Sequence, residues 1–220
     1  MGRINVNIGV RVNRGYFISL EGGEGTGKST QSKALKIKLE AKGLKVHLTR
    51  EPGGTLGAET IRELLLSGTD GKWSMRTEAM LFAAARADHC AKLIVPVLES
   101  GTWVISDRFI DSSRAYQTVS GELNDNDIMA AHQVGSQNLM PDRTFILDLP
   151  EEVAARRAAA RDRGDSDRIG GRDSSYHQAV MANFRRYTVE QPDRVKLINA
   201  SHSVEVITEN LLSNLADLIG

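Results

Sequence analysis

The sequence has 220 residues, of which 40% are hydrophobic, which is enough to form the buried core of one large domain. Its 28 basic and 28 acidic residues balance, so no overall electric field favours nucleic acid or a membrane surface. A single cysteine, Cys90, excludes an internal disulfide and a cysteine-based zinc cluster, and no apolar run is long enough to span a bilayer. We therefore expect a protein of a reducing, cytoplasmic compartment.

Residues 1–15 precede the first convincing strand and read as a loosely ordered extension, so we expect one domain over residues 16–220. Helical patterns separate five short β-rich runs. This alternation predicts an α/β fold with a five-stranded parallel sheet and helices on both of its faces. Ligands of such sheets bind at the carboxyl ends of the strands, and four of the runs end in polar residues. The runs are 16–21, 46–50, 103–106, 144–148 and 195–199.

The first run leads into GGEGTGKST, which fits the P-loop pattern G-x-x-x-x-G-K-[ST], and a helix over 31–41 follows in the order that the motif requires. Glycines let successive backbone N–H groups point at one anion. Lys28 supplies a cation for the β- and γ-phosphates of a nucleotide, and the Ser29 hydroxyl suits Mg²⁺. The alternative is a glycine-rich turn that precedes a lysine by chance. The predicted ATP-binding residues are Gly22, Gly23, Glu24, Gly25, Thr26, Gly27, Lys28, Ser29 and Thr30.

Two further strand ends carry charged residues. Arg50 is followed by a turn-forming Pro-Gly-Gly, and it either belongs to an ordinary loop or holds a second phosphate. The run 103–107 is a hydrophobic strand ending in Asp107, the Walker-B arrangement for reaching Mg²⁺. Arg108 comes next, and it either forms a surface ion pair with Asp107 or Asp111 or acts on a transferred phosphoryl group.

Two pairs of residues at helical i, i+4 spacing are candidates for binding a base. Phe82 and Arg86 share one face of a long helix predicted over 75–100, where a phenylalanine is more often core and the arginine an exposed neighbour. Ser113 and Gln117 have the same spacing, and their ordinary use is in the core or in helix capping. If these residues bind a base, Phe82 supplies an aromatic face for stacking and Arg86 a guanidinium near a base carbonyl. The Gln117 amide can donate one hydrogen bond to the base edge and accept another.

An arginine-rich segment follows Pro150. Helix formers extend to about Arg161 and place Arg157 on the same face, whereas glycines and alternating charges beyond it predict a mobile loop. The segment is either a solvated charged stretch or a lid over a polyphosphate, at about 157–172. Its arginines are not balanced by any apolar anchor, which favours the lid; those beyond Arg157 are Arg161, Arg163, Arg168 and Arg172.

The motifs GGEGTGKST, TREPGG, LFAAAR, SDRFIDSSRAYQ and the arginine-rich stretch ending in DRI occur in the order and spacing of a known family. From about residue 16 to 220 the chain resembles bacterial thymidylate kinases, which are P-loop kinases of nucleoside monophosphates. The combination of REPGG with DR…SS..AYQ separates it from adenylate and guanylate kinases. The resemblance implies transfer of the ATP γ-phosphoryl group to dTMP with Mg²⁺, in dTTP synthesis, by a homodimer. The balanced charge predicts neither a nucleic-acid nor a membrane partner.

The resemblance also implies roles for individual residues. Lys28 and the loop amides would hold the ATP phosphates, with Ser29 and Asp107 on the Mg²⁺ side, while Arg50 and Arg108 would bind the monophosphate and the phosphoryl group in transfer. Phe82 would stack on thymine, Arg86 and Gln117 would read its edge beside Ser113, Tyr116 would crowd the sugar 2′ position, and Glu24 would approach the 3′-hydroxyl. Because Gly25 stands where some relatives carry an arginine, the catalytic arginines should be Arg161 and Arg163. Gly170 stands where the family often has a glutamate after DRI.

Three alternatives remain open. One is a kinase for another pyrimidine nucleotide such as dUMP. Another is a kinase for a thymidine-type nucleoside, which would need a carboxylate base, and Glu24 is the obvious candidate. The third is a non-catalytic P-loop switch; guanine-specific switches carry N-K-x-D, which does not occur here, and the D-x-x-G match at 167–170 does not follow a strand.

Overall fold

The structure, a computed structural model, describes residues 14–69, 71–162 and 168–219, and only the backbone of residues 158, 159, 161 and 162. Within these ranges five strands form one sheet in the order β2-β3-β1-β4-β5, and every neighbouring pair is parallel. The predicted parallel α/β sheet is confirmed, and each strand bound lies within one residue of the expected one. The strands are β1 (Phe17–Glu21), β2 (Val46–Arg50), β3 (Trp103–Asp107), β4 (Arg143–Asp148) and β5 (Val195–Asn199).

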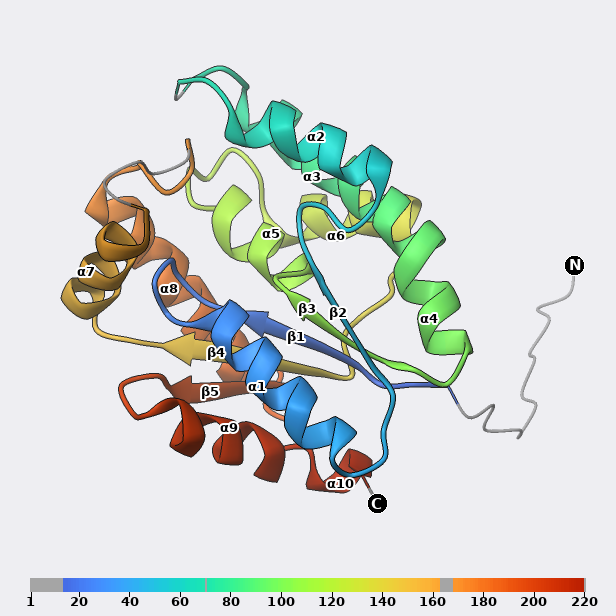
Figure 1. The fold of residues 1–220 in the computed structure, drawn as a ribbon. Helices are drawn as coiled ribbons and strands as arrows, with labels where there is room; N and C mark the ends of the chain where they lie inside the picture. The colour runs from blue at the N-terminus through green and yellow to red at the C-terminus, as the bar shows by residue number, and fades with distance from the viewer. Residues whose placement is uncertain (1–13, 70, 163–167, 220) are drawn as a thin grey trace, which may run out of the picture.

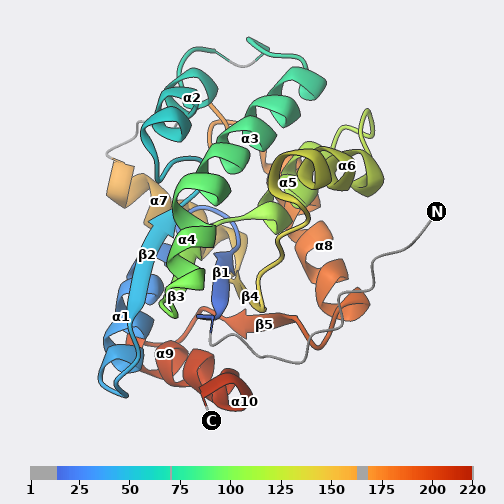
Figure 2. The same cartoon turned by 90° about the vertical axis from the view of Figure 1, so that its right-hand side faces the viewer.

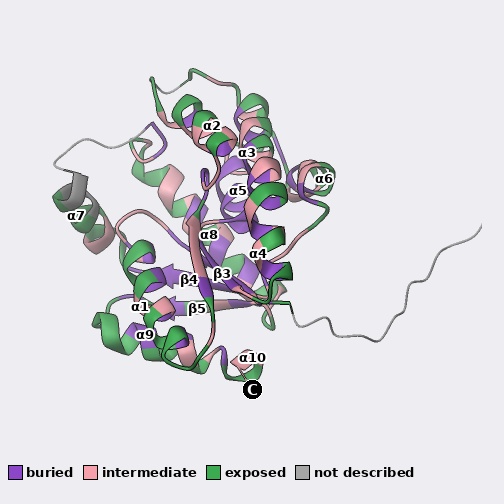
Figure 3. Cartoon of the chain, turned by 45° about the vertical axis from the view of Figure 1, so that its right-hand side comes forward, coloured by how far each residue is buried: buried purple, intermediate pink, exposed green. Residues whose placement is uncertain are grey.

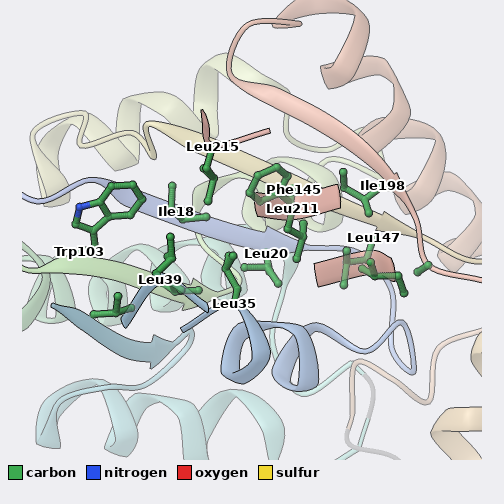
Figure 4. Packing of buried hydrophobic residues seen from close by; sticks show 14 of the residues in the cluster. Ile18, Leu20, Leu35, Leu39, Trp103, Phe145, Leu147, Ile198, Leu211 and Leu215 are labelled. Carbon is green, nitrogen blue, oxygen red and sulfur yellow. The ribbon is translucent and has the colours of Figure 1, made fainter. Parts of the chain in front are cut away.

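One face of the sheet is covered by α1 (Lys28–Glu40) and α9 (Val204–Ser213), with the short α10 (Ala216–Ile219) after them (Figure 1). Leu35 and Leu39 of α1 are four residues apart, so they share the helix face that packs on the strands. Figure 4 shows them beside residues from β1, β4 and α9 in one core. Its labelled members are Ile18, Leu20, Leu35, Leu39, Trp103, Phe145, Leu147, Ile198, Leu211 and Leu215.

The opposite face carries a second group of helices, and the view in Figure 2 shows α5, α6 and α8 on that side. Phe17 and Val104 belong to a second core cluster, together with Ala79, Leu98, Ile110 and Ile128 from helices on this side of the sheet. Figure 3 shows buried strands between helices whose outer surfaces are exposed. The helices are α3 (Met75–His89), α4 (Val95–Glu99), α5 (Ile110–Gln117), α6 (Asp125–Ser136) and α8 (Ser174–Glu190).

The single helix predicted over 75–100 is interrupted by a π-helical turn, η1 (Cys90–Ile94), between α3 and α4. Pro96 explains the interruption, because proline has no N–H for the helical hydrogen bond and its ring collides with the carbonyl group four residues earlier. The wider turn relieves this collision while the chain continues in the same direction.

The elements that surround the site follow the carboxyl ends of the strands. Helix α1 begins at Lys28 rather than near Gln31, so the P-loop lysine and serine lie in its first turn. Helices α2 (Leu56–Leu66) and α7 (Glu151–Asp162) follow β2 and β4 (Figure 1). Of the predicted extension 1–15, only Arg14 and Gly15 fall within the described residues. No helix among the described residues is long and apolar enough to cross a membrane.

Candidate active site

A cavity of about 730 Å³ opens at the carboxyl ends of β1, β2 and β3. Its walls come from the P-loop, α2, α3, α5, the segment before α8 and the loop between β5 and α9. Most of the predicted site residues line it: Glu24, Gly25, Thr26, Gly27, Lys28, Ser29, Thr30, Arg50, Phe82, Arg86, Asp107, Arg108, Ser113, Tyr116 and Gln117. The structure thus brings together residues from four separate motifs of the sequence.

The loop between β1 and α1 wraps around the side chain of Lys28. The Lys28 Nζ donates hydrogen bonds to the carbonyl oxygens of Gly22 at 3.2 Å and Gly23 at 2.6 Å. Gly22 has a φ of 131°, and a β-carbon there would lie 2.6 Å from the carbonyl oxygen of Leu147, so this turn requires glycine. Gly27 has no side chain to cap α1, which leaves the first helical amides for an anion.

Burial, followed by the positive charge of Arg108, lowers the pKa of Lys28 to about 7. Both causes disfavour a positive charge at this position, and a bound polyphosphate would counteract them by adding negative charge nearby. The P-loop therefore has the electrostatic character of an anion site, in addition to its shape.

Ser29 and Asp107 meet beside the P-loop. The Ser29 hydroxyl donates a hydrogen bond of 2.5 Å to a carboxylate oxygen of Asp107. The parallel register of β1 and β3, with Leu20 opposite Asp107, sets this carboxylate next to the start of the loop. A hydroxyl and a carboxylate are hard oxygen ligands of the kind that Mg²⁺ takes together with phosphate oxygens.

Arg108 follows β3 and has a φ of 71°, which is unusual for a residue with a side chain. Its Nη1 donates to the carbonyl oxygen of Gly22 at 3.0 Å and to the hydroxyl of Ser112 at 3.2 Å, and its guanidinium lies 5.0 Å from the ring centre of Tyr116. The alternative of an ion pair with Asp111 is wrong, because Asp111 is fully buried and pairs with Arg114 and Arg194 instead.

Glu21, the last residue of β1, positions the segment that contains Arg108. Its carboxylate accepts hydrogen bonds from the backbone N–H of Phe109 at 2.8 Å and from the Ser112 hydroxyl at 2.5 Å. Burial, followed by the charge of Asp111, raises the pKa of Glu21 to about 8. An acid at the end of a buried strand directly before a P-loop was the available signal for this residue.

Arg50 ends β2 and lines the same cavity as Arg108. Its Nη2 lies 3.0 Å from both carboxylate oxygens of Glu59 in α2, and one of those oxygens also accepts from the N–H of Gly54 at 2.9 Å. Glu59 therefore fixes both the arginine and the turn after it. The two arginines that we expected to meet phosphate lie on neighbouring strands, since Arg50 is opposite Asp107 in the register.

Arg86 is 3% exposed, so its reading as an exposed helix neighbour is wrong. Its Nε donates to Glu51 at 2.8 Å and its Nη2 to the hydroxyl of Ser113 at 2.8 Å. Gln117 is 1% exposed; its Nε2 donates to Glu78, and its Oε1 has no hydrogen-bond partner within the described part of the chain. The cavity thus presents a fixed guanidinium and a buried amide oxygen beside the ring of Phe82.

Glu24 lies against the segment that precedes α8. A β-carbon built on Gly170 would lie 2.7 Å from a carboxylate oxygen of Glu24, so the two residues are in direct contact. The Gly170 carbonyl oxygen in turn lies 3.3 Å from the Nε2 of His177 on α8. Any side chain at position 170 would displace the Glu24 carboxylate, which gives a physical meaning to the glycine in the DRIGG sequence.

The expectation that the arginine-rich segment has no apolar anchor is wrong at its carboxyl end. Ile169 is buried in a cluster with Tyr116 and Phe184, and Arg168 and Arg172 both donate to a carboxylate oxygen of Glu78, at 2.5 and 2.9 Å. Tertiary packing has overridden a composition that favours a loop. The Arg161 side chain and the whole of Arg163 lie outside the described residues, so their roles stay predictions.

Besides Glu21, two buried acids, Glu78 and Glu51, were not singled out from the sequence. Glu78 precedes Phe82 and Arg86 by four and eight residues, so the same helix face that suggested the pair also contains Glu78. Glu51 stands next to Arg50 and contacts both Arg86 and His89. Arg157 lines the far end of the cavity together with residues of the β5–α9 loop, His202, Ser203 and Val204.

Comparisons with known proteins agree with this geometry. The family model for thymidylate kinase matches residues 20–211. The chain belongs to the thymidylate kinase family. A thymidylate kinase of Rhizorhabdus wittichii is 51% identical over 205 residues, which cover 93% of this chain and 99% of that protein. One from Bradyrhizobium diazoefficiens is 45% identical over 205 residues, covering 93% and 90%. The crystal structure of thymidylate kinase from Ehrlichia chaffeensis matches with a TM-score of 0.73 at 30% identity, covering 92% of this chain and 98% of that one.

Proposed function

We propose that the protein transfers the γ-phosphoryl group of ATP to dTMP and forms dTDP, as a nucleoside monophosphate kinase. The observation that carries this proposal is one cavity in which the P-loop faces a pocket with Arg86 and the amide oxygen of Gln117. Membership of the thymidylate kinase family supports the same reaction.

The pocket beyond Arg108 suits the thymine of dTMP. Free N–H groups of Arg86 would donate to the 4-carbonyl oxygen of the base, and the Gln117 oxygen would accept the proton on N3. Phe82 would stack on the ring, since aromatic side chains supply a sequence-independent π-face for a base. Tyr116 would exclude a 2′-hydroxyl, and Glu24 would receive the 3′-hydroxyl.

The attacking atom is a phosphate oxygen that is already anionic near neutral pH, so the reaction needs no general base. Catalysis then comes from in-line positioning and from positive charge around the transferred group. Lys28, Arg50 and Arg108 are the described cations that line the cavity on the phosphate side. We assign the same role to Arg161 and Arg163 of the lid.

Mg²⁺ is part of the proposal. Ser29 and Asp107 would hold the ion at the β- and γ-phosphates, and the hydrogen bond of 2.5 Å between their side chains supports this assignment. When bound, Mg²⁺ neutralises part of the charge that develops on the phosphate oxygens. The described residues include no cluster of three His, Cys, Asp or Glu side chains that could hold a metal without phosphate.

We also propose that the protein is a cytoplasmic homodimer with one kinase domain over residues 16–220, preceded by an extension. Exposed apolar side chains on α2, α3 and α6 support a self-association surface there, because apolar side chains gain free energy when an interface removes them from water. They are Leu56, Leu64, Met80 and Val134. Light scattering at several protein concentrations measures the oligomeric state.

The reaction is tested by ADP release with ATP and Mg²⁺ across dTMP, dUMP, UMP, dCMP, AMP, GMP and thymidine. We expect the highest rate with dTMP and a weaker one with dUMP. A faster rate with AMP or GMP would remove Phe82, Arg86 and Gln117 from the base pocket. Thymidine as the best acceptor would make the protein a nucleoside kinase, and nucleotide binding without transfer to any acceptor would favour a switch.

A further inference from the structure

We propose that Glu78 is a positioning residue for the acceptor base: its buried carboxylate holds the Gln117 amide with the oxygen toward the cavity. The site then selects a pyrimidine that carries a proton on N3. This inference rests on the proposed function, because it assumes that Gln117 faces the base of the acceptor nucleotide.

The geometry around Glu78 divides its two carboxylate oxygens between different partners. Oε2 accepts from Arg168 at 2.5 Å and from Arg172 at 2.9 Å, and Oε1 lies 3.4 Å from the Nε2 of Gln117. The Glu78 side chain is fully buried, so no bulk water competes for either oxygen. The two guanidinium groups balance the buried negative charge and leave Oε1 facing Gln117.

This arrangement decides which end of the Gln117 amide faces the cavity. A carboxylate can only accept hydrogen bonds, so it favours the amide NH₂ on its own side. The reversed amide would set two acceptor oxygens against each other in a buried place and lose the donor. The buried Oε1 of Gln117, which lacks a partner among the described residues, is then the atom presented to a ligand.

The other half of the pocket edge is fixed in the same way. Glu51 and Ser113 bind the Nε and Nη2 of Arg86, so the guanidinium is a donor of set orientation. A donor next to an acceptor complements the 4-carbonyl and N3–H of thymine or uracil. Cytosine offers an amino group and an unprotonated N3, so it mismatches both positions.

The substitution Glu78→Gln tests this inference. If the new amide at position 78 keeps its oxygen toward Arg168 and Arg172, its NH₂ group faces Gln117. This NH₂ group then favours the orientation in which the oxygen of the Gln117 amide points toward position 78. The Gln117 NH₂ then faces the base. The test compares kcat/KM for dTMP with kcat/KM for 5-methyl-dCMP, whose base differs from thymine only at the 4-substituent and at N3. We expect the ratio of the two values to fall at least about ten-fold, chiefly because KM for dTMP rises.

Glu63→Gln is the matched control, since it makes the same chemical change at an exposed position of α2 and should leave the ratio unchanged. A purely structural role of Glu78 would lower both kcat/KM values together. An unchanged ratio in a folded Glu78→Gln protein would overturn the inference. If that variant is too unstable to assay, Glu78→Asp keeps the charge for the arginines but shortens the reach to Gln117, and an unchanged ratio there is equally decisive.

Gln117→Leu separates this inference from the proposed function. We expect it to lower the ratio by itself, and Glu78→Gln added to it should change the ratio no further, because the two residues act as one unit. A ratio that Gln117→Leu leaves unchanged would instead refute the assignment of Gln117 to the base. If Gln117→Leu lowers the ratio and Glu78→Gln does not, the base pocket stands and the role of Glu78 is refuted.

Discussion

Two cations, the buried Lys28 and the partly buried Arg108, share one carbonyl group under the P-loop. The oxygen of Gly22 accepts from the Lys28 Nζ at 3.2 Å and from the Arg108 Nη1 at 3.0 Å. Two positive charges this close repel each other, which is one cause of the lowered pKa of Lys28. Phosphate between them would turn the repulsion into two attractions, so the site favours the nucleotide electrostatically as well as sterically.

We predict that Lys28→Ala and Arg108→Ala each lower kcat by about 10²–10³-fold, the usual loss for one donor in a preorganised charged site. Initial-rate assays with dTMP, together with thermal unfolding, measure the effect. Lys33→Ala on the exposed side of α1 is the control and should retain activity. A folded variant at Lys28 or Arg108 that keeps its kcat would remove that residue from the reaction.

Glu21 predicts a pH dependence of stability. Its pKa rises from 4.5 to about 8 on folding, so above the unfolded value the folded chain binds a proton that the unfolded chain releases. The contribution of Glu21 to the free energy of unfolding is complete at low pH, and it is lost as the pH rises through the pKa of Glu21 in the folded protein. Relative to wild type, Glu21→Gln should therefore gain up to about 1.4 kcal/mol of unfolding free energy per pH unit between about pH 5 and pH 7. Denaturant titrations at three pH values measure this, and a constant difference would contradict it.

At the scale of elements, the segment before α8 joins the P-loop to α3. Arg168 of this segment donates a hydrogen bond to Glu78, and Ile169 packs in the cluster that contains Tyr116 and Phe184. Gly170 contacts the side chain of Glu24. These contacts make the segment a wall of the cavity, which Ile169 lines. A glycine at position 170 lets the acid of the P-loop lie directly against the backbone.

We predict that Gly170→Ala displaces the Glu24 carboxylate at little cost in stability, because the contacted atoms are at the end of a flexible side chain. If Glu24 binds the sugar 3′-hydroxyl, losing that hydrogen bond should lower kcat/KM for dTMP by about ten-fold. The measurement is repeated in a Glu24→Ala background, where Gly170→Ala should have no further effect. An equal loss in both backgrounds would show that the glycine acts through something other than Glu24.

At the scale of the whole molecule, one buried polar network connects β4 and the start of β5 to helix α5. Asp111 of α5 is fully buried and accepts from Arg194 at 2.7 and 2.9 Å, from Arg114 at 3.0 Å and from Thr144 of β4 at 3.0 Å. Although burial alone would raise the pKa of Asp111, the hydrogen bonds and charges of Arg194 and Arg114 outweigh it and lower the pKa. Helix α5 carries Ser113, Tyr116 and Gln117, so this network sets where they lie.

We predict that Asp111→Asn lowers the free energy of unfolding by about 3 kcal/mol, because it leaves two guanidinium groups without their buried counter-charge. Denaturant titration at neutral pH measures the loss. Asp193→Asn, an exposed acid near the same strand end, is the control and should change stability little. Equal stability of the two variants would mean that solvent or rearranged partners replace Asp111.

The sequence alone predicted the strand ranges, the parallel sheet and the P-loop, because these depend on short-range information. Each of these features is encoded within a few consecutive residues: the strands by apolar runs, and the P-loop by its glycines and by the spacing of Lys28 and Ser29. The same local signal explains why the long helix over 75–100 was predicted but its π-helical turn was not. The helical periodicity can be seen in any short stretch of this sequence. Whether the helix ends, kinks or widens at Pro96 depends instead on the packing of the residues that follow it.

Only the tertiary structure decided which partner each buried charged side chain has. Glu78 meets Arg168 across 90 positions, Arg108 meets Gly22 across 86, and Glu51 meets Arg86 across 35. Nothing in a local window distinguishes a buried, paired arginine from a solvated one, as the misread Arg86 and Arg168 demonstrate. A buried charge is tolerated only where folding supplies its partner, and strand register and helix packing determine which residue that partner is.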